Sequence, residues 1–213
     1  MALFQRRPQV SDPTNYYTVG QNKTVLLVGL GNPGPEYDNT RHNVGFLCLD
    51  DFVSRSDEME DWIEKKSLKC VISSGRMGEA RVIAIKPTTF MNLSGEAVQA
   101  VVNFYKINPE YIVVVHDELD IDFGQLRLRV GGASAGHNGI KSVTQNIGED
   151  YGRVRVGIGP KQPARIKSEA YVLQKWSPEQ VKQLPNLKKE VNAILSEYIY
   201  GGELPHETRQ FLV

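Results

Sequence analysis

A histidine that follows the loop after one predicted strand and an aspartate at the end of another could form a hydrolytic site. The apolar runs at 23–29 and 111–117 are of strand length and predict buried strands. His42 follows the first strand, and Asp117 ends the second. Ligands of open α/β sheets bind at the carboxyl ends of strands, so the two side chains can meet there as a general base and its orienting partner. Because no G-x-S-x-G elbow is present, water is the expected nucleophile.

Three asparagines occupy loops near these positions: Asn32, Asn92 and Asn138. A primary amide both donates and accepts hydrogen bonds, so it suits a substrate that contains ester and amide groups. Each asparagine could equally be a cap or turn residue. Asn92 can serve in both ways, because free N–H groups at the start of a helix can stabilise a developing oxyanion.

A metal centre is a second interpretation of the same region. Four carboxylates could bind a metal together with His42 or His137, and they belong to Asp117, Glu118, Asp120 and Asp122. Their spacing matches neither the H-E-x-x-H motif nor an EF-hand. We therefore expect no metal, and activity after chelation distinguishes the two interpretations.

A glycine-rich loop follows the first predicted strand, with the sequence Gly29-Leu30-Gly31-Asn32-Pro33-Gly34. It matches the G-x-G-x-x-G pattern of dinucleotide-binding folds. However, Pro33 and Pro35 remove two main-chain N–H groups where a pyrophosphate would need them, and Pro35 interrupts the helix that should begin there. Asp50, at the spacing of the ribose-binding acid, falls within a predicted helix. We expect no dinucleotide and no other cofactor.

The rest of the chain alternates strand and helix patterns. Further strands are expected at 68–73, 81–85, 125–130 and 153–158, the first two joined as a hairpin through 75–78, and helices at 43–55, 95–105 and 137–147. The predicted fold class is α/β: a single domain, with a mixed twisted β-sheet and helices on both faces.

The two ends of the chain carry distinct signals. Ser177-Pro178-Glu179-Gln180 is a capping box that starts a C-terminal helix. Pro185 should divide that helix into a short segment and a longer one at 187–200. Residues 1–22 have no periodic pattern, and we interpret them as an irregular N-terminal extension of a domain that spans 23–213.

Composition excludes several other classes of protein. The 213 residues are 40% hydrophobic and include 25 basic residues, 25 acidic residues and two cysteines. No apolar run approaches the ~20 residues that span a bilayer, and the N-terminus has no hydrophobic signal region, so we expect a cytoplasmic protein without a membrane partner. Cys48 and Cys70 lack C-x-x-C spacing, and we expect them to be buried rather than nucleophilic.

The zero net charge conceals a segregation of charge along the chain. Residues 36–64 contain nine acids and two bases, whereas residues 123–167 contain eight bases and two acids. Strand alternation places Arg127 and Arg129 on one face, and it does the same for the pair Arg153 and Arg155. The segments are either solvated faces of opposite sign or, for the basic one, a surface that binds a polyanion.

Five blocks of sequence, spread over residues 24–211, together resemble the bacterial-type peptidyl-tRNA hydrolases. In order, they are Val28 to Gly45 with Asn32, Tyr37 and His42, then Lys86 to Gly95, His116 to Asp120, Gly136 to Gly139, and Arg153 to Gly159. The resemblance implies an esterase that cleaves the bond between the C-terminal carboxyl of a peptide and the 3′-ribose of tRNA. Such an enzyme recycles tRNA from peptidyl-tRNA that has dropped off the ribosome during translation.

The resemblance also implies a role for each matching residue. His42 would be the base that activates water, and Asp117 would be its partner. Asn32 would position the ester and the water as a third catalytic residue. The positions that match the substrate-binding residues of the family are Tyr37, Met91, Asn92 and Asn138.

The resemblance implies a nucleic-acid partner as well. Arg127, Arg129 and Arg153 match basic residues that clamp a tRNA phosphate, so peptidyl-tRNA would be held at its acceptor stem and 3′ CCA end by a monomeric, metal-independent enzyme. The loop at 131–136 would be a mobile gate, in which Ala135 replaces a glycine of many relatives. The alternative function is that of a relative with the same fold that binds RNA without catalysis, as a splicing cofactor does.

Overall fold

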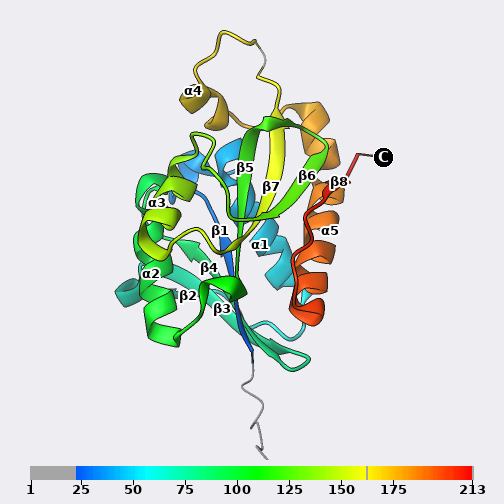
Figure 1. The fold of residues 1–213 in the computed structure, drawn as a ribbon. Helices are drawn as coiled ribbons and strands as arrows, with labels where there is room; N and C mark the ends of the chain where they lie inside the picture. Colours follow the sequence, from blue (N-terminus) through cyan, green and yellow to red (C-terminus); the bar gives the residue numbers. More distant parts are fainter. Residues whose placement is uncertain (1–22, 162, 213) are drawn as a thin grey trace, which may run out of the picture.

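The computed structural model describes residues 23–161 and 163–212, which form a mixed β-sheet between two layers of helices (Figure 1). The eight strands lie in the order β2-β3-β4-β1-β5-β7-β6-β8. Their bounds are β1 Thr24–Gly29, β2 Ile63–Lys65, β3 Cys70–Met77, β4 Ala80–Pro87, β5 Ile112–Asp122, β6 Gln125–Val130, β7 Gly152–Gly159 and β8 Thr208–Gln210. The central strands β4, β1, β5 and β7 are parallel, and antiparallel strands flank them on both sides. The predicted fold class is confirmed.

Helices cover both faces of the sheet. Their bounds are α1 Val44–Arg55, α2 Ser94–Tyr105, α3 Asn138–Ile147, α4 Ser168–Val172 and α5 Pro178–Gly201. Val25 and Leu27 of β1 pack in a core with α1 and α5, whereas Leu26 and Val28 pack in a second core with α2 and α3. Because alternate side chains of one strand enter two cores, the central strands read as continuous apolar runs.

The predicted break of the C-terminal helix at Pro185 is wrong, since α5 continues from Pro178 to Gly201. An interior proline removes one helical hydrogen bond and clashes with the preceding turn, at a cost of about 3 kcal/mol or more. Leu184, Leu187 and Val191 on the same helix are buried, and each contributes about 1.5–3 kcal/mol by leaving water. The burial of this face offsets the cost of the proline.

The capping box that begins α5 is confirmed. The Ser177 hydroxyl accepts a hydrogen bond from the Gln180 main-chain N–H, and the Gln180 side chain accepts one from the Ser177 N–H. The predicted hairpin is also confirmed, but β3 and β4 are longer than expected, so the turn lies at Gly78 and Glu79 rather than at 75–78. The short elements β2, β8 and α4 had no signal, because three to five residues are too few to show a period.

Close backbone packing brings α1 against the carboxyl end of β1 and against Val115 of β5. A Cβ atom at Gly45 would lie 2.3 Å from the Leu30 nitrogen and 2.4 Å from the Val115 oxygen, so only glycine fits there. The 3-10 turn η2, Arg41–Asn43, leads directly into α1. This approach carries His42 to Asp117. The predicted end of the strand at Asp117 is wrong, since β5 continues to Asp122 and Asp117 lies in its middle.

The structure also bears on two sequence patterns. The glycine-rich loop after β1 leads into the 3-10 turn Pro35–Tyr37 rather than into an α-helix, as the prolines predicted, and Asp50 lies within α1. Among the residues that the structure describes, no helix is long and apolar enough to cross a membrane. The interpretation of residues 1–22 concerns a segment outside the described residues.

Candidate active site

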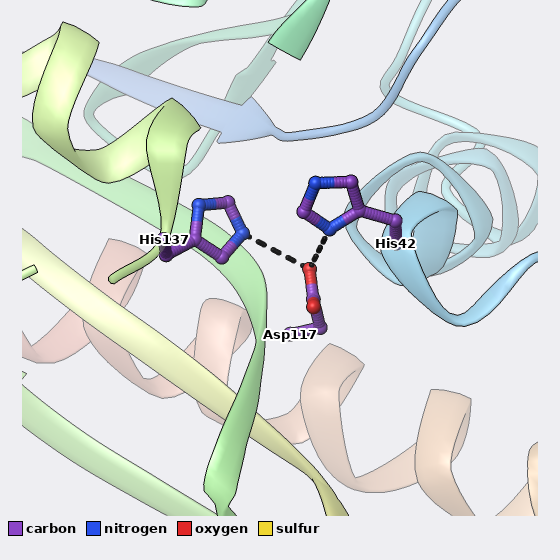
Figure 2. Close-up of side chains that lie close together, drawn as sticks. All are labelled: His42, Asp117 and His137. Carbon is purple, nitrogen blue, oxygen red and sulfur yellow. Dashed lines mark hydrogen bonds and ion pairs between the residues drawn. The ribbon is translucent and has the colours of Figure 1, made fainter. Parts of the chain in front are cut away.

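Two histidines from different elements converge on one oxygen of Asp117 (Figure 2). His42 lies in η2, Asp117 in β5, and His137 immediately before α3. The Nδ1 atom of His42 lies 2.8 Å from Oδ1 of Asp117, and the Nε2 atom of His137 lies 3.0 Å from the same oxygen. The predicted meeting of His42 and Asp117 is therefore present, and His137 joins them.

The hydrogen bonds assign the protons of both imidazoles. The main-chain N–H groups of Gly139 and Ile140 donate to Nδ1 of His137, which caps α3, so that atom carries a lone pair. His137 therefore bears its proton on Nε2 and donates it to Asp117. His42 donates to the same carboxylate through Nδ1, which leaves the lone pair of its Nε2 atom available for a proton.

The environment shifts the pKa values of Asp117 and His42. Burial alone would raise the pKa of Asp117, but the charges and hydrogen bonds of His42 and His137 outweigh it and hold the pKa of this carboxyl well below its usual range. Burial alone would lower the pKa of His42, but the charge of Asp117 and the hydrogen bond to it raise that pKa above its ordinary value. Asp117 is thus ionised at neutral pH, and His42 is a stronger base than a free imidazole.

Asn32 is held with its amide in one orientation. Its Oδ1 atom accepts a hydrogen bond of 2.7 Å from the Met91 main-chain N–H, so its NH₂ group is free to donate elsewhere. Asn43 holds the Asn32 main chain through two bonds of 2.9 Å, one donated and one accepted. Asn32 itself is buried and lines the cleft beside His42.

A cleft of about 700 Å³ contains most of the predicted substrate-binding residues. Met91 lines it and is buried, whereas Asn92 and Asn138 line it with exposed side chains. Neither asparagine is a helix cap, because α2 is preceded by Leu93 and α3 is capped by His137. Tyr37 is not among the lining residues. Its ring instead packs edge-on against Phe90, which does line the cleft, with the centroids 6.3 Å apart.

The strand register brings four arginines to one face of the sheet. Arg127 pairs with Arg155, and Arg129 pairs with Arg153, across the antiparallel strands β6 and β7. Arg127 and Arg129 are exposed, and within the described part of the chain neither pairs with a carboxylate. Arg155 is neutralised by the buried Glu118, with its NH2 atom 3.0 Å from Oε2.

Arg153 differs from the exposed pair because it is only 2% exposed. Its guanidinium donates to the main-chain oxygen of Ala133, at 3.0 Å, and stacks on the ring of Tyr151. Through this hydrogen bond Arg153 holds the main chain in the middle of the loop at 131–136. In that loop Ala135 has a φ of +47°, a left-handed conformation that costs a residue with a Cβ about 1–2 kcal/mol.

Two residues of this site, His137 and Asn43, were not predicted from the sequence in the positions that they occupy. His137 was considered only as a metal ligand, and its place beside Asp117 had no local signal because the two are 20 positions apart. Asn43 directly follows His42, and that proximity is the signal that could have found it. The cysteines are as predicted, since burial raises the pKa of Cys48 and of Cys70 to about 12.

A buried carboxylate holds an imidazole that has a free lone pair, beside an oriented amide and an open cleft, and this arrangement suits a hydrolase. Comparison with known proteins agrees with this class. Residues 26–211 match the model of the family described as peptidyl-tRNA hydrolase. The chain belongs to the peptidyl-tRNA hydrolase family, and it is accordingly a hydrolase that acts on ester bonds.

Individual relatives support this membership. The chain is 46% identical over 162 residues to a peptidyl-tRNA hydrolase of Rhodococcus opacus (strain B4), which covers 76% of this chain and 84% of that relative. It is 41% identical to one of Clostridium botulinum (strain Eklund 17B / Type B), over 81% and 94% of the two chains. A crystal structure of peptidyl-tRNA hydrolase from Acinetobacter baumannii superposes with a TM-score of 0.72 at 32% identity, over 85% and 90%. These names give no support to the splicing-cofactor alternative.

Proposed function

We propose that this chain hydrolyses the ester that joins the C-terminal carboxyl of a peptide to the 3′-ribose of tRNA. The observation that carries the proposal is the His42–Asp117 hydrogen bond, which leaves a basic nitrogen at the cleft. Membership in the peptidyl-tRNA hydrolase family supports the identity of the ester. The physiological role that follows is the release of tRNA from peptidyl-tRNA that leaves the ribosome early.

The proposed reaction uses water as the nucleophile. His42 Nε2 takes a proton from water as the water oxygen attacks the ester carbonyl, and Asp117 stabilises the imidazolium that forms. The Asn32 NH₂ group, oriented by the Met91 N–H bond, donates to the ester or the water. When the carbon–oxygen bond breaks, the proton on His42 passes to the ribose 3′-oxygen. The products are a 3′-hydroxyl and a peptide carboxylic acid, which releases the second proton of the water to solvent at neutral pH. Asn92 and Asn138 hold the peptide end, and Met91 supports them, with Tyr37 packed behind Phe90.

The proposed mechanism requires no metal and no cofactor. His42, Asp117 and His137 bring three ligand atoms within 4.8 Å of one another, which is close enough for a metal ion. However, Nδ1 of His137 is occupied by two main-chain donors, and its Nε2 proton points at Asp117. A metal would have to displace these hydrogen bonds, whereas an ester is reactive enough for a positioned water and a base.

The basic face supports a place for the RNA. We infer that Arg127 and Arg129 contact phosphates of the acceptor stem, while the 3′ CCA end enters the cleft. Arg153 belongs to the same clamp, and its buried position supports a role beneath the loop at 131–136. We also propose that the protein acts as a monomer in the cytoplasm and that residues 1–22 are an N-terminal extension of the domain.

Turnover of N-acetyl-aminoacyl-tRNA at neutral pH tests the function. Release of the acyl group, unchanged by a chelator, is the expected result. Binding of tRNA without release of the acyl group would contradict the proposal and restore the binding-only alternative.

A further inference from the structure

Arg41, which directly precedes His42, is buried and has no role in the proposed reaction. It is 7% exposed. Its guanidinium lies 4.5 Å from the ring centroid of Tyr171 and 5.9 Å from that of Trp176. Its Nη2 atom donates to Oε1 of Gln180, and its Nη1 atom donates to Oε1 of Gln174. Every one of these partners belongs to α4, to α5 or to the segment between them.

No carboxylate among the described residues pairs with Arg41, which is unusual for a buried arginine. The two terminal nitrogens of its guanidinium donate to neutral amide oxygens while the group lies over aromatic rings, an arrangement that a lysine cannot reproduce. The Nε atom is buried and has no hydrogen-bond partner among the described residues. The main chain reinforces the link, because the Arg41 N–H donates to the Gln174 carbonyl, and Thr40 forms a β-bridge with Lys175. Arg41 therefore joins the turn that carries His42 to the segment that carries α4.

The helix α4 forms one wall of the catalytic cleft and stands at the top of Figure 1, near the ends of β5 and β7. Val172 and Leu173 from this segment line the cleft, together with Leu119 and Phe90. The cleft is lined by carboxylates but by no lysine or arginine among the described residues. The α4 wall itself contributes Ser168, Glu169, Val172 and Leu173. This wall offers an acid and apolar side chains, so it suits the peptide, and the phosphates of the 3′ CCA end would lie away from it.

We propose that Arg41 is a positioning residue, which holds α4 in place as the wall that contacts the peptide part of the substrate. It acts on substrate binding through α4 and takes no part in proton transfer. The nature of the group that contacts α4, a peptide, rests on the proposed function. The contact by which Arg41 holds α4 does not depend on it. Two kinds of measurement therefore follow, one of which needs no catalysis.

The first measurement is hydrogen exchange of the main chain in Arg41→Gln. We expect faster exchange at residues 168–176 and unchanged exchange in α3. Arg209→Gln is the matched control, because Arg209 is a partly buried arginine that pairs with Glu190, Glu197 and Glu207 away from the cleft. Equal protection of residues 168–176 in Arg41→Gln and wild type would overturn the inference, whether or not the wild type hydrolyses peptidyl-tRNA.

The second measurement is kinetic. With N-acetyl-phenylalanyl-tRNA we expect Arg41→Gln to raise KM about tenfold with kcat within about threefold of wild type, as for the loss of binding that is equal in ground and transition states. Binding of uncharged tRNA should be unchanged. Arg41→Lys should resemble Arg41→Gln, since it keeps the charge but loses the fork.

Three outcomes would overturn the proposal: a parallel loss of tRNA affinity, full rescue by lysine, or a fall in kcat at constant KM. Tyr171→Leu removes the same contact from the α4 side and should reproduce the rise in KM. It keeps the test decisive if Arg41→Gln does not fold. A wild type without turnover would refute the proposed function. The hydrogen-exchange data would still test whether Arg41 holds α4 in place.

Discussion

The shared oxygen of Asp117 leads to a specific prediction for Asp117→Asn. An asparagine has one acceptor oxygen and one NH₂ donor in place of two equivalent oxygens. If the amide turned its NH₂ group toward His42, that histidine would have to accept at Nδ1 and carry its proton on Nε2, and the base would be lost. The orientation of the new amide therefore decides how much activity remains.

His137 should fix that orientation. Its Nδ1 atom is held as an acceptor by Gly139 and Ile140, so its Nε2–H must face an acceptor at position 117. A turned amide would set N–H against N–H in a buried site, which costs about 1–3 kcal/mol for an unsatisfied donor. We therefore expect Asp117→Asn to keep its oxygen toward both histidines and His42 to keep its correct tautomer.

The remaining loss follows from the missing charge. Hydrogen bonds to charged groups contribute about 1.5–3 kcal/mol and neutral ones about 0.5–1.5 kcal/mol, so the difference is about 1–1.5 kcal/mol, or roughly tenfold in kcat. His137→Ser removes the constraint while serine still caps α3. In the double variant the amide can turn, and kcat should fall by ~10²–10⁴, the value of a general base and more than the product of the two single effects.

Single-turnover hydrolysis of N-acetyl-aminoacyl-tRNA by wild type, both single variants and the double variant measures this cycle. The acid limb of the pH profile gives an independent reading, because loss of the Asp117 charge leaves burial unopposed and should move the pKa of His42 to lower pH. A loss of more than ~10³-fold in kcat for Asp117→Asn alone, with no further loss when His137→Ser is added, would show that His137 does not fix the amide.

Three further predictions concern the base, its titration and the RNA surface. His42→Ala should lower kcat ~10²–10⁴-fold with tRNA affinity unchanged, and retention of more than about a tenth of the activity would exclude His42 as the base. In wild type, kcat/KM should fall as the pH is lowered, with a midpoint pH above 6.5, the ordinary pKa of histidine. The reason is that His42 must be neutral to accept a proton and its pKa is raised. A midpoint below pH 6.5 would contradict this assignment. Arg127→Ala combined with Arg129→Ala should raise KM and flatten its salt dependence by about two phosphate contacts, measured between low and moderate salt, and an unchanged slope would remove both arginines from the RNA surface.

Local patterns predicted the elements that bury the most apolar surface. The strands at 23–29 and 111–117 and the three helices before residue 150 were found within one or two residues at most ends, since each buries a continuous run or a complete helical stripe. The strand at 111–117 extends to Asp122, where pairing with β7 continues through polar residues that carry no apolar signal. Pro185 was misjudged because a local cost was weighed without the burial that offsets it.

Residue types in short linked motifs were enough to predict the fold class, the meeting of His42 with Asp117, and the resemblance that points to the ester. Three features became visible only in the folded chain: His137 shares the Asp117 oxygen, the two arginine pairs form one face, and Arg153 is buried within that face. The physical reason is the same in each case. Strand register and the packing of α3 set contacts between residues far apart in the chain, and no local pattern encodes a distance of that kind.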